Sequence, residues 1–171
     1  MMMALVVLAV LLAVAAPGFY ELIKNNRMLS EVYALRATLN GARSEALAQR
    51  NFVTLCRSAD GATCSTGDWN SGFIAFLDEN GNGAVDDPNA PLFLSKVKDE
   101  GELQVSYRYT VGGSSGNWVQ FDSRGYAAKD SQGTFTVCDI RGPSHARGLS
   151  ISAGGVVSAV ELDPNDPNLC N

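Results

Sequence analysis

The sequence predicts an α+β protein in which one long N-terminal helix packs against an antiparallel β-sheet head. Residues 1–50 contain only two glycines and one proline, and good helix formers dominate after residue 20. Residues 51–171 instead alternate short runs of β-branched and aromatic residues with clusters of Gly, Asn, Asp and Ser, a pattern typical of β-hairpins. Strands that follow one helix, without βαβ alternation, indicate the α+β class.

The composition indicates a single folded domain. The 171 residues are 46% hydrophobic and 18% charged, with a formal net charge of −5. The acidic excess lies after Arg50, whereas residues 1–50 are slightly basic. An acidic head disfavours general binding of nucleic acid, because that affinity comes largely from neutralised phosphates.

Residues 1–20 carry no charge and form an almost entirely apolar segment at the start of the helix. Twenty helical residues rise about 30 Å, which matches the hydrocarbon core of a bilayer. We therefore expect a membrane segment. A cleaved signal peptide would carry a positive region ahead of its apolar residues, and a buried core helix would be less uniform. Pro17 and Gly18 predict a kink or a melted turn near the end of the segment.

The second half of the helix is amphipathic. Apolar residues at spacings of three, four or seven form one stripe, which consists of Leu22, Leu29, Val32, Leu35, Leu39, Ala42 and Ala46. Arg36, Arg43 and Arg50 recur every seven residues on another side. We interpret this row of arginines as a solvated face, in preference to a binding surface.

An apolar helix half with a proline near its end, followed by an amphipathic half and a β head, resembles the type IV pilins and the type II secretion pseudopilins. The stretch Leu35–Arg50, followed by Phe52–Cys56, is similar to the GspH/FimT/FimU-type minor pilins in particular. In that family the mature N-terminus reads Phe-Thr-Leu-Ile-Glu after a basic leader. Counting back from Pro17, those residues are absent here, so we expect the natural reading frame to extend upstream of Met1.

The resemblance implies a structural subunit of a type IV pilus or a type II secretion pseudopilus, and not an enzyme. Residues 1–22 would be the apolar half of the helix, in the inner membrane or the filament core. Residues 23–50 would be the amphipathic half, and residues 51–171 a periplasmic head. The implied partners are the N-terminal helices of other pilins or pseudopilins and the inner membrane, with no small-molecule substrate.

The alternative function is that of a DNA-binding minor pilin for DNA uptake. Some FimT-type members take up DNA through a Gly-Arg-x-Arg motif in the C-terminal strand. The matching stretch here is Ser152–Ser158, in which Val156 and Ser158 stand where the arginines would lie. The resemblance therefore does not favour DNA as a partner.

We expect eight strands in the head, each a short run bounded by turn residues. Their expected ranges are 51–56, 72–77, 92–95, 103–109, 118–121, 134–138, 148–152 and 156–162. The strands that end at residues 121 and 138 are both followed by Asp-x-Arg-Gly, at Asp122–Gly125 and Asp139–Gly142. Asp caps turns with its side chain and Gly supplies positive φ, so we interpret the repeat as two similar turns.

Four cysteines beside an N-terminal membrane segment indicate an oxidising compartment and structural disulfides. Cys56, Cys64, Cys138 and Cys170 allow three pairings, and the absence of a Cys-x-x-Cys pair gives little support to a zinc site. Cys56 and Cys64 bracket a short loop that is easily closed, so we expect them to pair. Cys138 would then bind Cys170 and tie the C-terminal tail to a core strand.

One segment has the chemistry of a metal site. Asp78, Asn80, Asn82 and Asp86 match the first half of an EF-hand-like calcium loop. The twelfth position is Asn89 instead of the bidentate Glu, and Asn-Gly is also the strongest hairpin signal. A polar hairpin turn and a calcium site are therefore both open interpretations. Apart from calcium, we expect no cofactor.

Arg141, His145 and Arg147 form the only basic cluster of the head. We interpret it as a solvated loop in preference to a patch that binds DNA or another anion. Ser144 and His145 are adjacent instead of converging from different elements, and no carboxylate can be assigned to orient the imidazole. The sequence therefore predicts no catalytic site.

Overall fold

The computed structural model describes residues 2–65, 68–87, 92–97, 103–110, 116–128 and 131–170. The fold is α+β, as predicted. In the described residues the elements are α1 (Met2–Gln49), β1 (Val53–Arg57), β2 (Gly72–Leu77), β3 (Leu92–Val97), β4 (Gln104–Tyr109), β5 (Trp118–Phe121), β6 (Gly133–Cys138), the short 3-10 helix η1 (Pro143–His145), β7 (Arg147–Ile151) and β8 (Val157–Val160). Each expected strand is present, with ends that differ by two residues or fewer from the expected ones.

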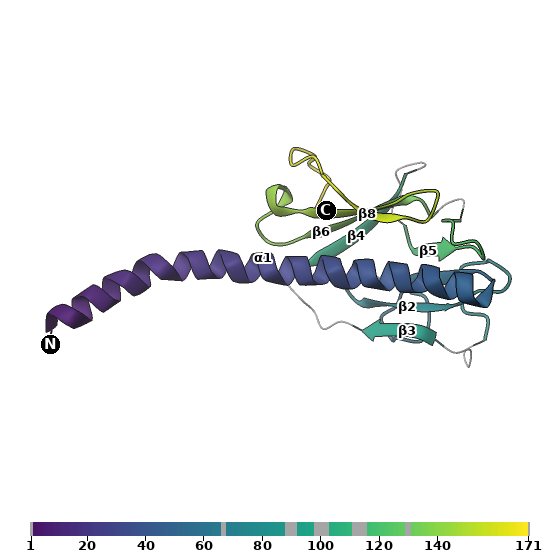
Figure 1. Cartoon of the computed structure of the whole chain (residues 1–171), viewed down its shortest axis with the longest axis horizontal. Helices are drawn as coiled ribbons and strands as arrows, with labels where there is room; N and C mark the ends of the chain where they lie inside the picture. Colours follow the sequence, from purple (N-terminus) through teal and green to yellow (C-terminus); the bar gives the residue numbers. More distant parts are fainter. Residues whose placement is uncertain are drawn as a thin grey trace.

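α1 is one continuous helix that passes through Pro17 and Gly18, so the predicted melted turn does not form. Figure 1 shows a gradual bend in the N-terminal part of the helix. A proline removes one helical hydrogen bond and pushes against the preceding turn, which can bend a helix without unwinding it. Within the described residues, no helix has the length and hydrophobicity that a membrane crossing requires.

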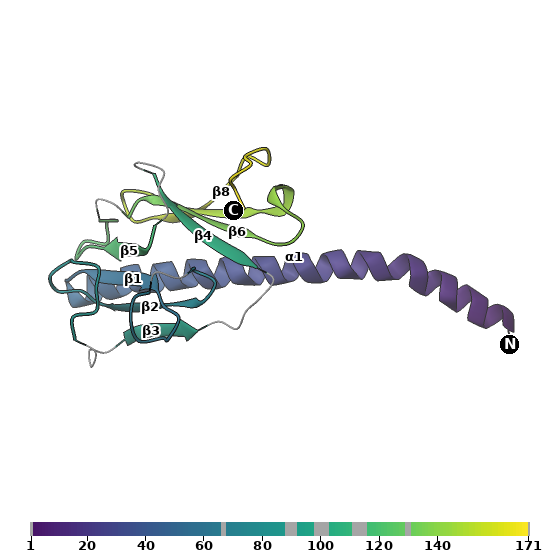
Figure 2. The same ribbon diagram turned by 180° about the vertical axis from the view of Figure 1, so that it is seen from behind.

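The strands form two four-stranded antiparallel sheets, with the orders β3–β2–β1–β5 and β4–β6–β7–β8. The division arises after β3, because β4 pairs with β6 while β5 returns to pair with β1. In Figure 1, β2 and β3 lie on one side of α1, and β4, β6 and β8 lie on the other; Figure 2 shows the same arrangement from behind. The C-terminal half of α1 therefore runs along the junction of the two sheets.

The hydrophobic core lies where this half of α1 meets both sheets. The buried apolar residues of the helix are Met28, Val32, Leu35, Leu39, Ala42 and Ala46, and they pack with strand residues that include Leu55, Phe121, Phe135 and Leu149. The predicted stripe therefore packs in the head from Val32 to Ala46, whereas its first two members do not. Leu22 is 53% exposed and Leu29 is 38% exposed, because Met28 is aligned with the later buried residues and Leu29 lies one position further round the helix.

Arg43 also departs from the expected solvated face. Its Nε donates a hydrogen bond to the carbonyl oxygen of Gly125 at 2.8 Å, and its Nη2 donates to that of Gly154 at 3.3 Å. The two loops meet so closely that a Cβ on Gly155 would lie 2.0 Å from the Gly125 oxygen. The other two arginines of the row are exposed, as expected. Arg43 thus ties α1 to the loop after β5 and to the turn between β7 and β8.

Candidate functional site

The four cysteines form the two disulfides that the loop lengths favour, Cys56–Cys64 and Cys138–Cys170. The Cα–Cα distances are 5.6 and 5.8 Å. The first disulfide closes the loop that follows β1. The second joins the end of β6 to the C-terminal tail, where Leu169 is buried. The tail is therefore held against the sheet although its described residues, which end at Cys170, form no strand or helix.

Asp78 begins the turn that the sequence offers as a calcium site, and it is only 1% exposed. Its Oδ2 accepts hydrogen bonds from Thr54 Oγ1 at 2.7 Å and from Gln120 Nε2 and the Gly83 N–H, both at 2.8 Å. These donors come from β1, from β5 and from the turn itself. A buried carboxyl group needs such partners, so Asp78 anchors the turn to the sheet.

Asn80, Asn82 and Asp86 lie at the exposed tip of the same turn. The side-chain amides of Asn80 and Asn82 donate to the two carboxylate oxygens of Asp86, at 2.6 and 3.0 Å. These bonds support the polar-hairpin interpretation. Among the described residues, no group of three or more His, Cys, Asp or Glu side chains has metal-site geometry, and Asn89 lies outside those residues. Calcium binding stays a prediction.

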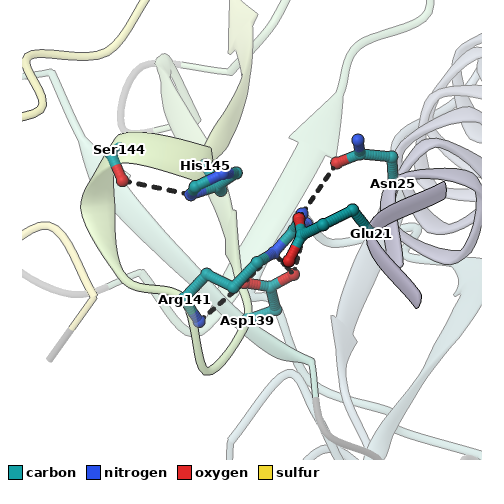
Figure 3. Close-up of polar contacts among 6 residues, drawn as sticks. All are labelled: Glu21, Asn25, Asp139, Arg141, Ser144 and His145. Carbon is teal, nitrogen blue, oxygen red and sulfur yellow. Dashed lines mark hydrogen bonds and ion pairs between the residues drawn. The ribbon is translucent and has the colours of Figure 1, made fainter. Parts of the chain in front are cut away.

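The loop after β6 carries a polar cluster that joins the head to α1 (Figure 3). Arg141 Nε and Nη2 donate to Asp139 Oδ2 at 2.9 and 2.6 Å. From α1, Glu21 Oε2 and Asn25 Oδ1 accept from Arg141 Nη1 at 2.7 and 2.9 Å. The exposed fraction of the side chain is 10% for Arg141, 3% for Asp139 and 52% for Glu21. We call these four residues the Arg141 cluster.

The charged groups of the Arg141 cluster shift one another's pKa values. Burial alone would raise the pKa of Asp139, but hydrogen bonds from the side chain and N–H of Arg141 outweigh burial, so this pKa lies below its ordinary value. The hydrogen bond to Asp139, and then that to Glu21, raise the pKa of Arg141. Lys24 is only 7% exposed, and its Nζ lies 4.3 Å from the centre of the Tyr20 ring. It adds positive charge near Asp139.

This arrangement corrects the expectation of a solvated basic loop. Arg141 is turned towards α1 and is bonded to two carboxylates, whereas His145 is half-buried and Arg147 is exposed. Arg141, His145 and Arg147 therefore do not present three equivalent charges to an anion. The contacts of Arg141 with α1 were missed because the loop pattern contains no signal for a partner about 120 residues away in the chain.

The related turn at Asp122–Gly125 shows how strongly the surroundings matter. Arg124 Nη2 bonds Asp122 Oδ2 at 3.0 Å, which repeats the pairing of Arg141 with Asp139. However, 76% of the Arg124 side chain is exposed. The two turns are alike in sequence and local bonding, and both contact α1, the first through the bond from Arg43 to Gly125. Only in the second does the arginine of the turn itself bond the helix.

Ser144 and His145 both belong to η1, and Ser144 Oγ lies 3.1 Å from His145 Nδ1 (Figure 3). In the part of the chain that the structure describes, no carboxylate bonds the imidazole to orient it. A nucleophile and base of the triad type need such a third group. The absence of enzymatic activity stays a prediction.

A groove of about 460 Å³ lies between α1 and the β7–β8 hairpin. Leu29, Tyr33 and Arg36 line it from the helix, and Arg147 and Val160 line it from the strands. We call this feature the α1–β8 groove. Sequence reasoning did not find it, because its two walls are more than 100 residues apart in the chain.

Known proteins share both the sequence pattern and the fold of this chain. The family model described as type II transport protein GspH matches residues 31–155. The type IV minor pilin FimU of Pseudomonas aeruginosa, solved in two crystal forms, is 22% identical in both. The match to the first crystal form covers 86% of this chain and 98% of the FimU chain, with a TM-score of 0.57. The match to the second covers 84% of this chain and 99% of the FimU chain, with a TM-score of 0.54. These two matches show a common fold.

A third solved structure, the minor pseudopilin EpsH from the type 2 secretion system of Vibrio cholerae, is 12% identical and has a TM-score of 0.49. The match covers 80% of this chain and 96% of the EpsH chain. No curated protein sequence matches the chain.

Proposed function

This chain belongs to the GspH family of type II transport proteins and is a minor pilin or pseudopilin, and from this premise we propose that it is anchored in the inner membrane with its head in the periplasm. In this proposal it primes or caps a type IV pilus or a type II secretion pseudopilus. Its role is structural, and its partners are the N-terminal helices of other pilins or pseudopilins.

The shape of α1 is the observation that carries the proposal. The helix is continuous over 48 residues; its C-terminal half packs in the head, and its N-terminal half projects beyond it (Figure 1). The uncharged sequence of residues 1–20 supports the membrane location, because as a helix it is about 30 Å long. A rigid connection between the head and the projecting half would transmit the position of one to the other.

Exposed apolar side chains on α1 support packing against other helices. Phe19, Leu22 and Ile23 are 63%, 53% and 62% exposed and lie in neighbouring turns of the projecting half. Contiguous exposed apolar surface of this kind marks sites of interaction with other proteins or with membranes. The side chains of other filament helices would cover it.

The proposal is tested by genetic complementation in the source bacterium. Deletion of the gene should reduce piliation or secretion, and the natural gene should restore it. A gene that lacks the codons for residues 2–22 should not restore it, although its product keeps the residues of the head core. Restoration by the shortened gene, or undiminished piliation and secretion after deletion, would contradict the proposed role.

A further inference from the structure

We propose that the α1–β8 groove receives the acidic end of a neighbouring head, that of a second copy of this chain. This inference rests on the proposed filament role and assigns a partner chemistry to a surface outside the helix core. The groove exists because the inner face of the β7–β8 hairpin extends beyond the helix. Leu149 pairs with Ala159 in the strand register, and side chains alternate along a strand. Arg147 and Ala159 therefore lie on the same face as the core residue Leu149, and the small Ala159 leaves the space open.

The walls of the groove combine apolar surface with positive charge. On the helix wall, Leu29 is 38% and Tyr33 is 63% exposed. Arg36 on the helix and Arg147 on β7 place a guanidinium group on each wall, and both side chains are exposed. Within the described part of the chain, neither group makes an ion pair. The surface is therefore suited to a partner that brings both apolar contacts and carboxylates.

The volume and the net charge of the groove limit which part of a neighbouring subunit can fit into it. A helix with its side chains is 10–12 Å across and occupies about 1,000 Å³ per 10 Å of length, whereas the groove holds about 460 Å³. A few side chains from a loop fit, but a whole helix does not. Among the described residues that line the groove, Glu161 is the only carboxylate, so the two arginines leave a net positive charge.

This chain shows what an acidic head end looks like. The turn after β2 exposes Glu79, Asp86 and Asp87. It lies level with the end of α1, because the last residue of β2, Leu77, pairs with Val53, which closely follows the end of the helix in the chain. The groove lies beside residues 29–36, which is about 20–30 Å earlier along the helix. Subunits with parallel helices, shifted by this distance, would bring the acidic end of one head to the groove of the next.

Such a contact is heterologous, since it joins different surfaces of the two subunits, so that one subunit uses its acidic end and the other its groove. It can also be weak. Packed helices would hold neighbouring heads at a high effective concentration, so that a contact of low intrinsic affinity is still formed.

The test uses two complementary variants of the full-length chain in non-ionic detergent. The acceptor, Glu79→Gln with Asp86→Asn, keeps the groove and is labelled with ¹⁵N. The donor, Arg36→Gln with Arg147→Gln, keeps the acidic turn and is unlabelled. Addition of the donor should shift the acceptor amide signals of residues 29–36, 147–149 and 159–161, with half-saturation in the millimolar range.

Two controls separate charge recognition from other contacts. A donor that also carries Glu79→Gln and Asp86→Asn should bind about three- to tenfold more weakly, because two exposed ion pairs are lost. An acceptor with the additional change Arg50→Gln should respond as the acceptor does, because Arg50 is exposed just after the end of α1 and lies outside the groove. Unchanged binding by the neutral donor would overturn the proposal, as would the lack of any shift at the groove. The complementation experiment does not depend on this result, so the proposed function can stand if the groove assignment fails.

Discussion

Replacement of Arg141 by Gln should loosen the attachment of α1 at the point where it leaves the head. Removal of one partner from a fully buried ion pair costs about 3–5 kcal/mol. Asp139, 3% exposed, would keep the backbone N–H bond of residue 141 at 2.9 Å but lose the guanidinium. Lys24 would still offset part of its charge, and Glu21 is 52% exposed, so that its pair contributes only about 0.2–1 kcal/mol. We expect the free energy of unfolding to fall by about 2–3 kcal/mol and the Tm by about 4–12 °C.

The assay is urea unfolding of the full-length chain in non-ionic detergent, followed by the fluorescence of Trp69 and Trp118. Arg124→Gln is the matched control, because Arg124 makes the same local pair with Asp122 but its side chain is 76% exposed. That variant should lose less than about 1 kcal/mol. Hydrogen exchange at residues 21–25 of α1 should become faster in Arg141→Gln and stay unchanged in Arg124→Gln.

Equal losses in the two variants would refute the structural role of the Arg141 cluster. A second check combines Arg141→Gln with Asp139→Asn, which should be less destabilising than Arg141→Gln alone, because no unpaired charge is then buried. The stability difference should also depend on pH. The pKa of Asp139 is lower in the folded chain, so its contribution is fully present above the ordinary value of about 4 and is lost as the pH falls through the lowered value. The difference between wild type and Arg141→Gln should therefore shrink below about pH 4.

Three further predictions concern the other candidate sites. If the turn after β2 binds calcium, millimolar Ca²⁺ should raise the Tm by mass action and Asp86→Ala should remove the rise; no shift in the wild type would leave the polar hairpin as the interpretation. Non-reducing peptide mapping should find Cys138 joined to Cys170, and replacement of both by Ala should lower stability by about 2–4 kcal/mol and expose the tail to proteolysis; any other pairing would contradict the structure. In a mobility-shift assay at near-physiological salt, the chain should bind DNA weakly or not at all, and Val156→Arg with Ser158→Arg should increase binding. Submicromolar binding by the wild type would instead favour the DNA-uptake function.

Features that depend on neighbours in the chain could be predicted from the sequence. The helix and the eight strands follow from local composition and periodicity, and the structure has them within a few residues of the expected positions. The disulfide between Cys56 and Cys64 follows from a short loop, and it leaves one partner for Cys138. The turns at Asp122–Gly125 and Asp139–Gly142 follow from the local chemistry of Asp and Gly.

Features that depend on distant parts of the chain were decided only by the tertiary structure. No local pattern states that β5 returns to β1 and thereby divides the strands into two sheets. Nor does one state that Arg43 bonds a carbonyl 111 residues away.

The two Asp-x-Arg-Gly turns show the physical reason most directly. The sequence determined that the two segments would form similar turns, and in each turn the structure pairs the Asp with the Arg two residues later. Only the packing of the second turn against α1 removed Arg141 from solvent and gave it Glu21 and Asn25 as further partners. The same local ion pair is screened by water at Arg124 and shielded from it at Arg141, where it joins the head to the helix.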